Sequence, residues 1–248
     1  MHDLPHGSST TEWWYVNGHC VVEAGHRFSF FAAFFRKVTG YHPVTRAPRY
    51  AHSLTWSIND IDGDKARHVS RVDQRGPEEG LRRVKGGFGS RDPRIDRAIR
   101  EILERGVVPK PDLVFDGRVT VDLNHLSLDF ADDSFRKNAD DSYSLKLFDV
   151  HKAMGCELKF VPKKPPTRHG DNGVVRGSEN EQMFYYFIPR CEVTGTITTL
   201  GTQRTITQGQ GWYDHEFGVG EVFDVDLEAE ARLDPAERQR LIVERRTR

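Results

Sequence analysis

Apolar and polar residues alternate along most of this chain, and that alternation restricts the fold more than any other feature. Successive side chains of a β-strand point to opposite faces, so a period of two predicts strands buried on one face. Gly, Asn and Asp interrupt the alternating runs, as at Asp62-Gly63, which is typical of antiparallel hairpins. We therefore expect a mostly β protein, an antiparallel barrel or sandwich with two added helices.

The first two expected strands cover residues 13–24 and 28–38, separated by a turn at residues 25–27. The second has five Phe in eight residues, which predicts burial on both faces. In the run 118–130, Val119, Val121 and Leu123 share one face and the apolar positions then shift by one, which indicates a bulge near Asn124-His125. Further strands are expected at residues 52–73, 142–150, 156–161, 184–198 and 204–217.

Two helices are expected. The first covers residues 92–106, because Asp92 can cap it, Pro93 suits its first position and Gly106 can end it. The second begins at Asp234 with the same Asp-Pro start. The basic, glycine-rich stretch 74–91 is interpreted as a surface loop rather than a phosphate or nucleic-acid site. The predicted domains are a β domain at residues 1–225, with a helical insertion at about 92–106, and a C-terminal helical tail at 226–248.

Composition excludes several classes of function. The formal net charge is −1, so no global field attracts nucleic acid or an anionic membrane. Three well-separated cysteines fit a reducing compartment, and the N-terminal sequence has no signal-peptide pattern, so a cytoplasmic location is expected. The chain has no Walker loop, no G-x-S-x-G and no H-E-x-x-H, so neither a nucleotide cofactor nor a metal is expected. A metal site among the eleven histidines is the less favoured alternative.

The densest group of polar residues is GQGWYDHEFG at 209–218. On a strand, Trp212, Asp214 and Glu216 share one face, whereas Tyr213 and His215 lie on the other. Apolar walls and a like-charged neighbour would raise the pKa of one carboxyl group and suit it to acid/base chemistry. The alternative is that both acids only satisfy a turn and a surface rim.

Two further aromatic clusters allow the same two interpretations. In EWWY, at residues 12–15, Glu12 and Trp14 share one face of the expected strand, and Trp13 and Tyr15 share the other. In FYYFIPR, at residues 184–190, Tyr185 and Phe187 share a face opposite Tyr186. Each cluster is either core or the lining of a pocket, and periodicity leaves both possibilities open.

Four segments in this order resemble one family. They are EWWYVNGH at 12–19, FVPKKPPTRHGDNG at 160–173, FYYFIPRCEVTG at 184–195 and GQGWYDHEFG at 209–218. Together they resemble the AttH-type, lipocalin-like superfamily, which includes carotenoid hydratases, kievitone hydratases and lipocalin-like Diels–Alderases. The resemblance implies lipocalin-like β-barrels that bind hydrophobic small molecules and act without a redox cofactor.

The resemblance also implies roles for particular residues. The acid that protonates a double bond in the carotenoid hydratases corresponds to Asp214, with Trp212 in the place of a family Tyr. Tyr185 and Phe187 occupy the places of a family His and Trp, and this difference favours cyclisation or a pericyclic reaction over carotenoid hydration. His215 and Glu216 are expected to position Asp214 or relay its proton. The predicted substrate-binding residues are Trp212, Tyr213, Tyr185, Phe187, Trp14 and Glu12.

The sequence therefore predicts an enzyme, a hydratase (lyase) or cyclase of natural-product or isoprenoid biosynthesis. Its expected substrate is a polyene, terpenoid or polyketide held in an aromatic-lined pocket. The alternatives are a lipocalin-type carrier without activity and a half-barrel subunit of a catalytic partner. Family members usually have two lipocalin-like halves and the motifs here match only the first, so the expected partner is a second copy or another lipocalin-like chain.

Overall fold

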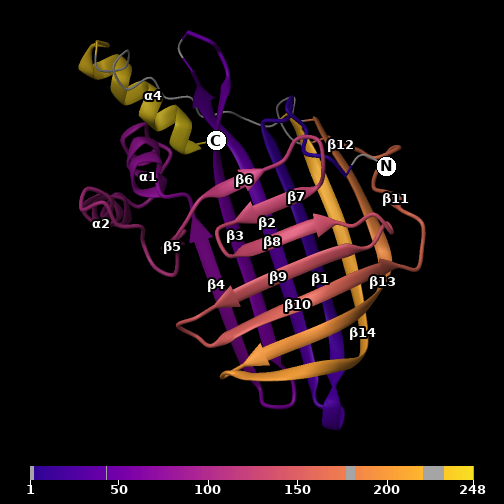
Figure 1. The fold of residues 1–248 in the computed structure, drawn as a ribbon. Coiled ribbons are helices and arrows are strands. Elements are labelled where there is room, and N and C mark those ends of the chain that lie inside the picture. Colours follow the sequence, from indigo (N-terminus) through magenta and orange to yellow (C-terminus); the bar gives the residue numbers. More distant parts are fainter. Residues whose placement is uncertain (1–2, 43, 177–181, 220–231, 248) are drawn as a thin grey trace. The chain divides into compact units, whose positions relative to one another are not determined.

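The structure is a computed structural model that describes residues 3–42, 44–176, 182–219 and 232–247 (Figure 1). Strands dominate it, which confirms the expected mostly β class. Three helices are described, α1 (Gly76–Lys85), α2 (Pro93–Leu103) and α4 (Pro235–Thr247), with a short 3-10 turn, η1 (Glu23–Gly25). The strands are β1 (Thr11–Val22), β2 (Arg27–Tyr41), β3 (Pro48–Asp60), β4 (Lys65–Val72), β5 (Leu113–Val114), β6 (Val119–Val121), β7 (Ser127–Phe130), β8 (Asp133–Lys137), β9 (Tyr143–Asp149), β10 (Met154–Pro162), β11 (Thr167–Arg168), β12 (Val174–Arg176), β13 (Gln182–Thr199) and β14 (Thr202–Val219).

The described residues separate into two compact units. The first comprises residues 3–37, 52–71 and 115–219 and contains most of the sheet and every candidate site residue. The second comprises residues 38–42, 44–51, 72–114 and 232–247 and contains the three helices, of which α1 and α2 contact each other. None of the helices in the described ranges is both long and apolar enough to cross a membrane.

The strands of the first unit follow the order β4-β3-β2-β1-β14-β13-β10-β9-β8-β7-β6, and β11 and β12 also pair with β13. The sheet curls into a half-barrel, so that strands distant in this order face each other across a core (Figure 1). Aromatic contacts show the curl. Phe34 of β2 lies 5.2 Å from Phe130 of β7, and Phe30 lies 5.9 Å from Phe160 of β10, measured between ring centroids.

Both expected helices are present. The Asp92 carboxylate caps α2 by accepting a hydrogen bond from the Arg94 backbone N–H at 2.9 Å. At the start of α4, the Asp234 carboxylate accepts in the same way from two backbone N–H groups, those of residues 236 and 237. These contacts are the ones that an Asp before a first-turn Pro predicts.

The loop interpretation of residues 74–91 was wrong, because residues 76–85 form α1. The helix has the charge pattern that favours a helix, with Glu78 and Glu79 in its first turn and basic residues in its last. Pro77 and Val84 are its buried residues. The glycines and basic residues of this stretch favour a loop, but its terminal charges and its two buried residues favour the helix that forms.

Two expectations about strands are also corrected. The expected bulge near Asn124-His125 is a chain reversal, since β6 and β7 pair antiparallel with Val121 opposite Leu128. The phenylalanine-rich strand is not buried on both faces, because one face of β2 packs into the core and the other does not. Phe28, Phe30 and Phe34 are buried, Phe31 is half-buried and Phe35 is exposed.

Candidate active site

Strand register divides the candidate residues between the two faces of the sheet. In the pairing of β14 with β1 and β13, His215 lies opposite Trp14 and Tyr186, and all three are buried in the core. Asp214, one residue earlier, lies opposite Tyr15 and Phe187 on the other face. We call the core side the inner face and the opposite side the outer face.

The outer face holds two carboxyl groups, Asp214 and Glu216, which we call the acid pair. Oδ2 of Asp214 accepts a hydrogen bond from the Trp212 indole N–H at 2.9 Å and another from the Tyr185 hydroxyl at 3.1 Å. The Trp212 ring stacks on Phe187, with centroids 4.3 Å apart and planes 13° from parallel. Asp214 is thus a buried carboxyl group fixed by two aromatic donors, while Glu216 beside it is half-buried.

The environment of the acid pair raises both pKa values. Burial raises the pKa of Asp214 to about 6, although the hydrogen bonds from Trp212 and Tyr185 oppose this shift. Burial, followed by the nearby charge of Asp214, raises the pKa of Glu216 to about 7. Between about pH 6 and 7 one carboxyl group of the pair can therefore be protonated while the other is ionised, so that one is an acid and the other a base.

Aromatic side chains extend the outer face from the acid pair across β1 and β2. Tyr15 lies 5.5 Å from Phe31, and Trp13 lies 5.9 Å from Phe35, between ring centroids. Asn17 donates a hydrogen bond to the Tyr15 hydroxyl at 2.9 Å. We use the name outer aromatic stripe for these rings together with those around Asp214: Trp13, Tyr15, Phe31, Phe35, Tyr185, Phe187 and Trp212.

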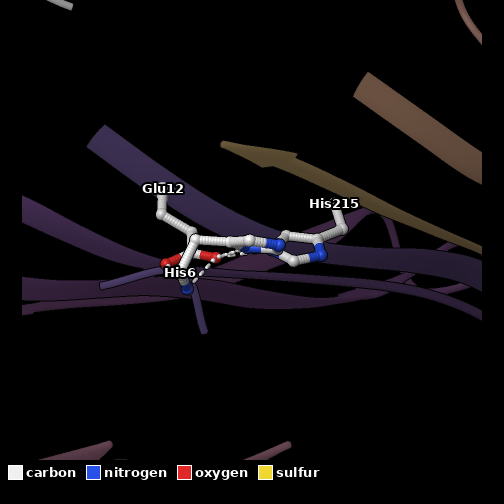
Figure 2. Close-up of side chains that lie close together, drawn as sticks. All are labelled: His6, Glu12 and His215. Carbon is white, nitrogen blue, oxygen red and sulfur yellow. Dashed lines mark hydrogen bonds and ion pairs between the residues drawn. The ribbon is translucent and has the colours of Figure 1, made fainter. Parts of the chain in front are cut away.

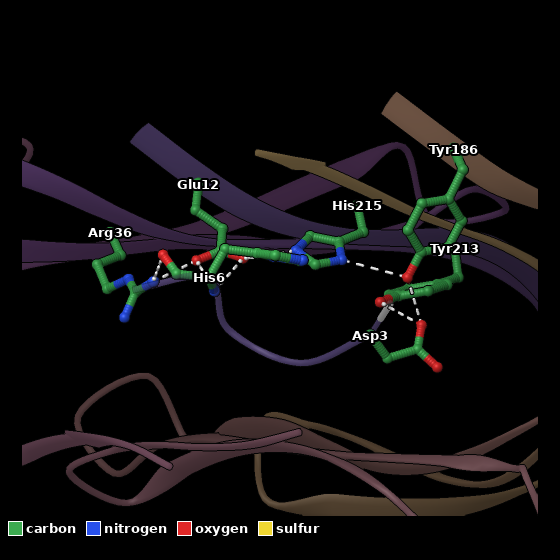
Figure 3. Close-up of polar contacts among 7 residues, drawn as sticks. All are labelled: Asp3, His6, Glu12, Arg36, Tyr186, Tyr213 and His215. Atoms are coloured by element: carbon green, nitrogen blue, oxygen red, sulfur yellow. Dashed lines mark hydrogen bonds and ion pairs between the residues drawn. The ribbon is translucent and has the colours of Figure 1, made fainter. Parts of the chain in front are cut away.

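The inner face holds a separate buried network centred on Glu12. Figure 2 shows His6 and His215 meeting its carboxylate, each with a ring nitrogen 2.9 Å from Oε1. The buried Arg36 guanidinium donates to Oε2 from the other side (Figure 3). The Trp14 ring stacks on His215, with ring centroids 5.0 Å apart. Burial alone would raise the pKa of Glu12, but the hydrogen bonds from the two histidines and the charge of Arg36 hold it at about 2.

His6, Glu12 and His215 also form the one group, among the described residues, whose ligand atoms could together hold a metal ion, since these atoms lie within 4.8 Å of one another (Figure 2). Two imidazoles and a carboxylate are a donor set that Zn²⁺ accepts. However, the Glu12 carboxylate already pairs with the buried guanidinium of Arg36, and a divalent cation would meet that fixed positive charge. The network therefore fits an ion pair better than a metal centre.

We expect dialysis of the protein against a strong chelator to leave its melting temperature unchanged. The physical reason is that the hydrogen bonds and the Arg36 charge already satisfy Glu12. Melting curves before and after dialysis, and after addition of Zn²⁺, measure this. A fall in melting temperature that Zn²⁺ reverses in the wild type but not in His215→Ala would contradict it and identify a metal site.

The predicted site residues divide between the two faces. Those on the outer face are Asp214, Glu216, Trp212, Tyr185 and Phe187, and those on the inner face are His215, Glu12, Trp14 and Tyr213. The expectation that His215 positions Asp214 or relays its proton is corrected by this division. Consecutive strand residues point apart, and the two ring nitrogens of His215 face Glu12 and Tyr186 instead.

The sequence interpretation missed Arg36, His6 and Asp3, which complete the inner network (Figure 3). A signal for Arg36 was present. It is a charged residue in phase with the buried phenylalanines of β2, and such a charge needs a buried partner. His6 and Asp3 precede the first strand, where no periodicity shows which side chains fold back onto the sheet.

The curled antiparallel sheet has a lipocalin-like fold. Residues 111–224 match the family model described as AttH-like, and this match confirms the resemblance expected from the motifs. Three of the four motifs lie inside that range, and EWWYVNGH precedes it. No curated protein matches the chain.

Two solved structures share the fold. An AttH protein from Nitrosomonas europaea is 18% identical with a TM-score of 0.59, and the match covers 88% of this chain and 54% of that one. Kievitone hydratase from Nectria haematococca is 11% identical with a TM-score of 0.54, and the match covers 88% of this chain and 53% of that one. The chain thus spans about half the length of the two proteins whose fold it shares.

Proposed function

We propose that the acid pair and the outer aromatic stripe form the active site of an enzyme that acts on an apolar polyene, terpenoid or polyketide. The observation that carries this proposal is the buried Asp214 carboxyl group, fixed by Trp212 and Tyr185 beside stacked aromatic rings. Burial there raises the pKa of Asp214 to about 6 and that of Glu216 to about 7. The fold shared with a protein named as a hydratase supports the same class of chemistry. The site needs no redox cofactor for it.

In hydration, the protonated member of the acid pair transfers its proton to one carbon of a double bond, and the π electrons form the new C–H bond. The neighbouring carbon becomes a cation, which the faces of Trp212 and Phe187 stabilise. A water oxygen then bonds to the cation and loses a proton to a carboxylate, which restores the pair. In cyclisation, a second double bond attacks the cation, and a carbon rather than water loses the final proton to the carboxylate.

The test offers purified protein a panel of linear isoprenoids, polyenes and polyketides in isotopically labelled water. Hydration produces an alcohol that contains one labelled oxygen, whereas cyclisation produces an isomer of unchanged formula apart from exchanged protons. Mass spectrometry distinguishes these outcomes. Tight binding of a probe without any product would contradict the proposed enzymatic activity and favour the alternative that the protein is a carrier.

A matched pair of tryptophan variants tests which face holds the ligand. Trp14 is fully buried, so Trp14→Ala is expected to cost about 3–5 kcal/mol of stability. Trp13 is half-buried on the outer face, so Trp13→Ala is expected to cost less stability but to weaken binding of the probes. Denaturant titration and fluorescence binding measure the two effects. If folded Trp14→Ala binds the probes more weakly and Trp13→Ala does not, the ligand site lies on the inner face.

We also propose that a second copy of the chain or another lipocalin-like chain packs over the outer aromatic stripe, so that the substrate is held between the two chains. Exposed aromatic surface favours association, and a stable interface buries at least about 1,000 Å². Light scattering at micromolar concentration should show a dimer that Phe35→Asp dissociates. The control is Phe148→Asp, which changes another exposed phenylalanine, on β9. A monomeric wild type with full activity would contradict the self-association form of the proposal.

A further inference from the structure

On the inner face, the Asp3 carboxylate receives hydrogen bonds from four side chains. Lys137 Nζ donates to Oδ2 at 2.8 Å, and the Tyr143 hydroxyl donates to the same oxygen at 3.0 Å. The hydroxyl of Tyr186 donates to Oδ1, and that of Tyr213 lies 3.4 Å from it (Figure 3). We call these four donors, Lys137, Tyr143, Tyr186 and Tyr213, the carboxylate cradle.

The donors and the acceptor come from different kinds of structure. The cradle residues lie on β8, β9, β13 and β14, so the curled sheet fixes all four of them. Asp3 lies on the segment before β1, outside the sheet. The cradle is thus part of the sheet, whereas the group that occupies it belongs to the segment before the first strand.

The cradle is built to accept an anion. The three tyrosines are buried, and burial raises the pKa of each, so their hydroxyls remain protonated donors. Burial would raise the pKa of Asp3, but Lys137 and the tyrosine hydroxyls outweigh it and lower the value. Fixed donors that converge on one site bind a negatively charged oxygen without reorganisation.

A further buried donor is connected to the cradle through Tyr186 and His215. Tyr186 joins the cradle to His215, whose Nδ1 is 3.2 Å from its hydroxyl oxygen, and Trp14 stacks on that imidazole. The Trp14 indole N–H is buried and has no hydrogen-bond partner among the described residues. A buried donor without an acceptor is costly, and an acceptor supplied by a ligand would remove that cost.

Besides Asp3, the segment before β1 is held by His6 and the residues after it: the His6 ring pairs with Glu12, and the His6 carbonyl accepts a hydrogen bond from Arg36 at 2.9 Å. The His6 ring stacks on Phe217 at 3.5 Å, and the His6 backbone N–H donates to Glu12. Backbone N–H groups of Ser9 and Thr10 donate to the carbonyls of His6 and Gly218. A ligand that supplied its own carboxylate would replace the Asp3 contacts without leaving the cradle empty.

We propose that the carboxylate cradle is a ligand-binding site for a small carboxylic acid, and that Asp3 occupies it until the ligand displaces residues 3–9. This site lies on the face opposite the acid pair, so it is separate from the proposed active site. The ligand competes with Asp3 for the cradle. Its apparent affinity is therefore the affinity for the empty cradle multiplied by the fraction of molecules in which Asp3 has left it.

The first experiment empties the cradle with Asp3→Ala and adds formate, which has the size of the lost carboxylate. We expect Asp3→Ala to melt at a lower temperature than the wild type. Formate should raise its melting temperature saturably, by about 2–4 °C or more, and uncharged formamide should not. The control is Asp140→Ala, which removes an exposed carboxylate that pairs with Lys159. Formate should not stabilise that variant.

The second experiment tests displacement in the unaltered chain. Benzoate should increase hydrogen exchange at the backbone amides of His6, Ser9 and Thr10, which donate hydrogen bonds in the occupied state. Benzamide should leave exchange unchanged. Asp3→Asn keeps the shape of the side chain but removes the negative charge that attracts Lys137. In this variant, benzoate should increase hydrogen exchange at about tenfold lower concentration than in the wild type.

The outcomes separate a binding site from a structural contact. If formate stabilises Asp3→Ala no more than it stabilises Asp140→Ala, or if formamide acts equally, Asp3 only fastens its segment and the proposal is overturned. If Asp3→Ala does not fold, the test rests on Asp3→Asn. The proposal is overturned if the benzoate concentration that gives half of the increase in hydrogen exchange is the same in Asp3→Asn as in the wild type. Neither result depends on the activity of the acid pair.

Discussion

Asp214→Asn is expected to lower the turnover number by roughly 10²–10⁴-fold, the usual contribution of a positioned acid or base. Asparagine keeps the shape of the side chain and can still accept the hydrogen bonds of Trp212 and Tyr185, but it cannot transfer a proton. The measurement is turnover of whichever isoprenoid, polyene or polyketide the labelled-water assay identifies. Folding is monitored by near-ultraviolet circular dichroism.

Glu216 provides the internal check on this prediction. Its pKa is raised by burial and by the charge of Asp214, so Asp214→Asn should lower the pKa of Glu216 toward its ordinary value. Carboxyl carbon chemical shifts measured against pH report this change. In the wild type, activity should be greatest between about pH 6 and 7 and should decline as the pair loses its last proton. Full activity in folded Asp214→Asn would exclude Asp214 as the acid.

Glu12→Gln is expected to cost about 3–5 kcal/mol of stability, because it leaves the buried charge of Arg36 without its counter-charge. Urea titration measures the loss. The matched control is Glu192→Gln, which breaks an exposed pair with Lys163 and should have little effect. Equal losses in the two variants would show that the inner network adds no more stability than a surface ion pair.

The pH dependence of stability gives a second measure of Glu12. Its pKa is lowered on folding from an ordinary value of 4.5 to about 2, so its contribution is complete above about pH 4.5 and is lost as the pH falls toward 2. That shift corresponds to roughly 3 kcal/mol. The wild type should therefore lose more stability than Glu12→Gln over this range. Equal losses of stability in the wild type and in Glu12→Gln over this pH range would contradict the lowered pKa of Glu12.

Much of the local structure could be predicted because it depends on neighbours in the sequence. Alternation correctly assigned Asp214, Glu216 and Trp212 to one face of a strand and placed Glu12 and Trp14 on a common face. The two Asp-Pro helix starts were also predicted correctly. The helix at residues 76–85 was not predicted, because its glycines and basic residues favour a loop although its terminal charges favour a helix.

The grouping of the site residues could not be predicted in the same way. Glu12 lies on β1, Arg36 on β2 and His215 on β14, and only the strand order and register bring the three side chains together. Asp3 belongs to no strand, so no pattern connects it to tyrosines 140 to 210 residues away. These contacts depend on the curl of the sheet and on where the segment before β1 lies.

By itself the sequence determined the class of fold, the family resemblance and the alternation that separates neighbouring side chains on each strand. Only the tertiary structure decided which face became the core. The same period of two describes a strand whichever side is buried, since the choice depends on how the sheet curls and which strands become neighbours. That choice separated the acid pair from His215 and enclosed Glu12 with Arg36.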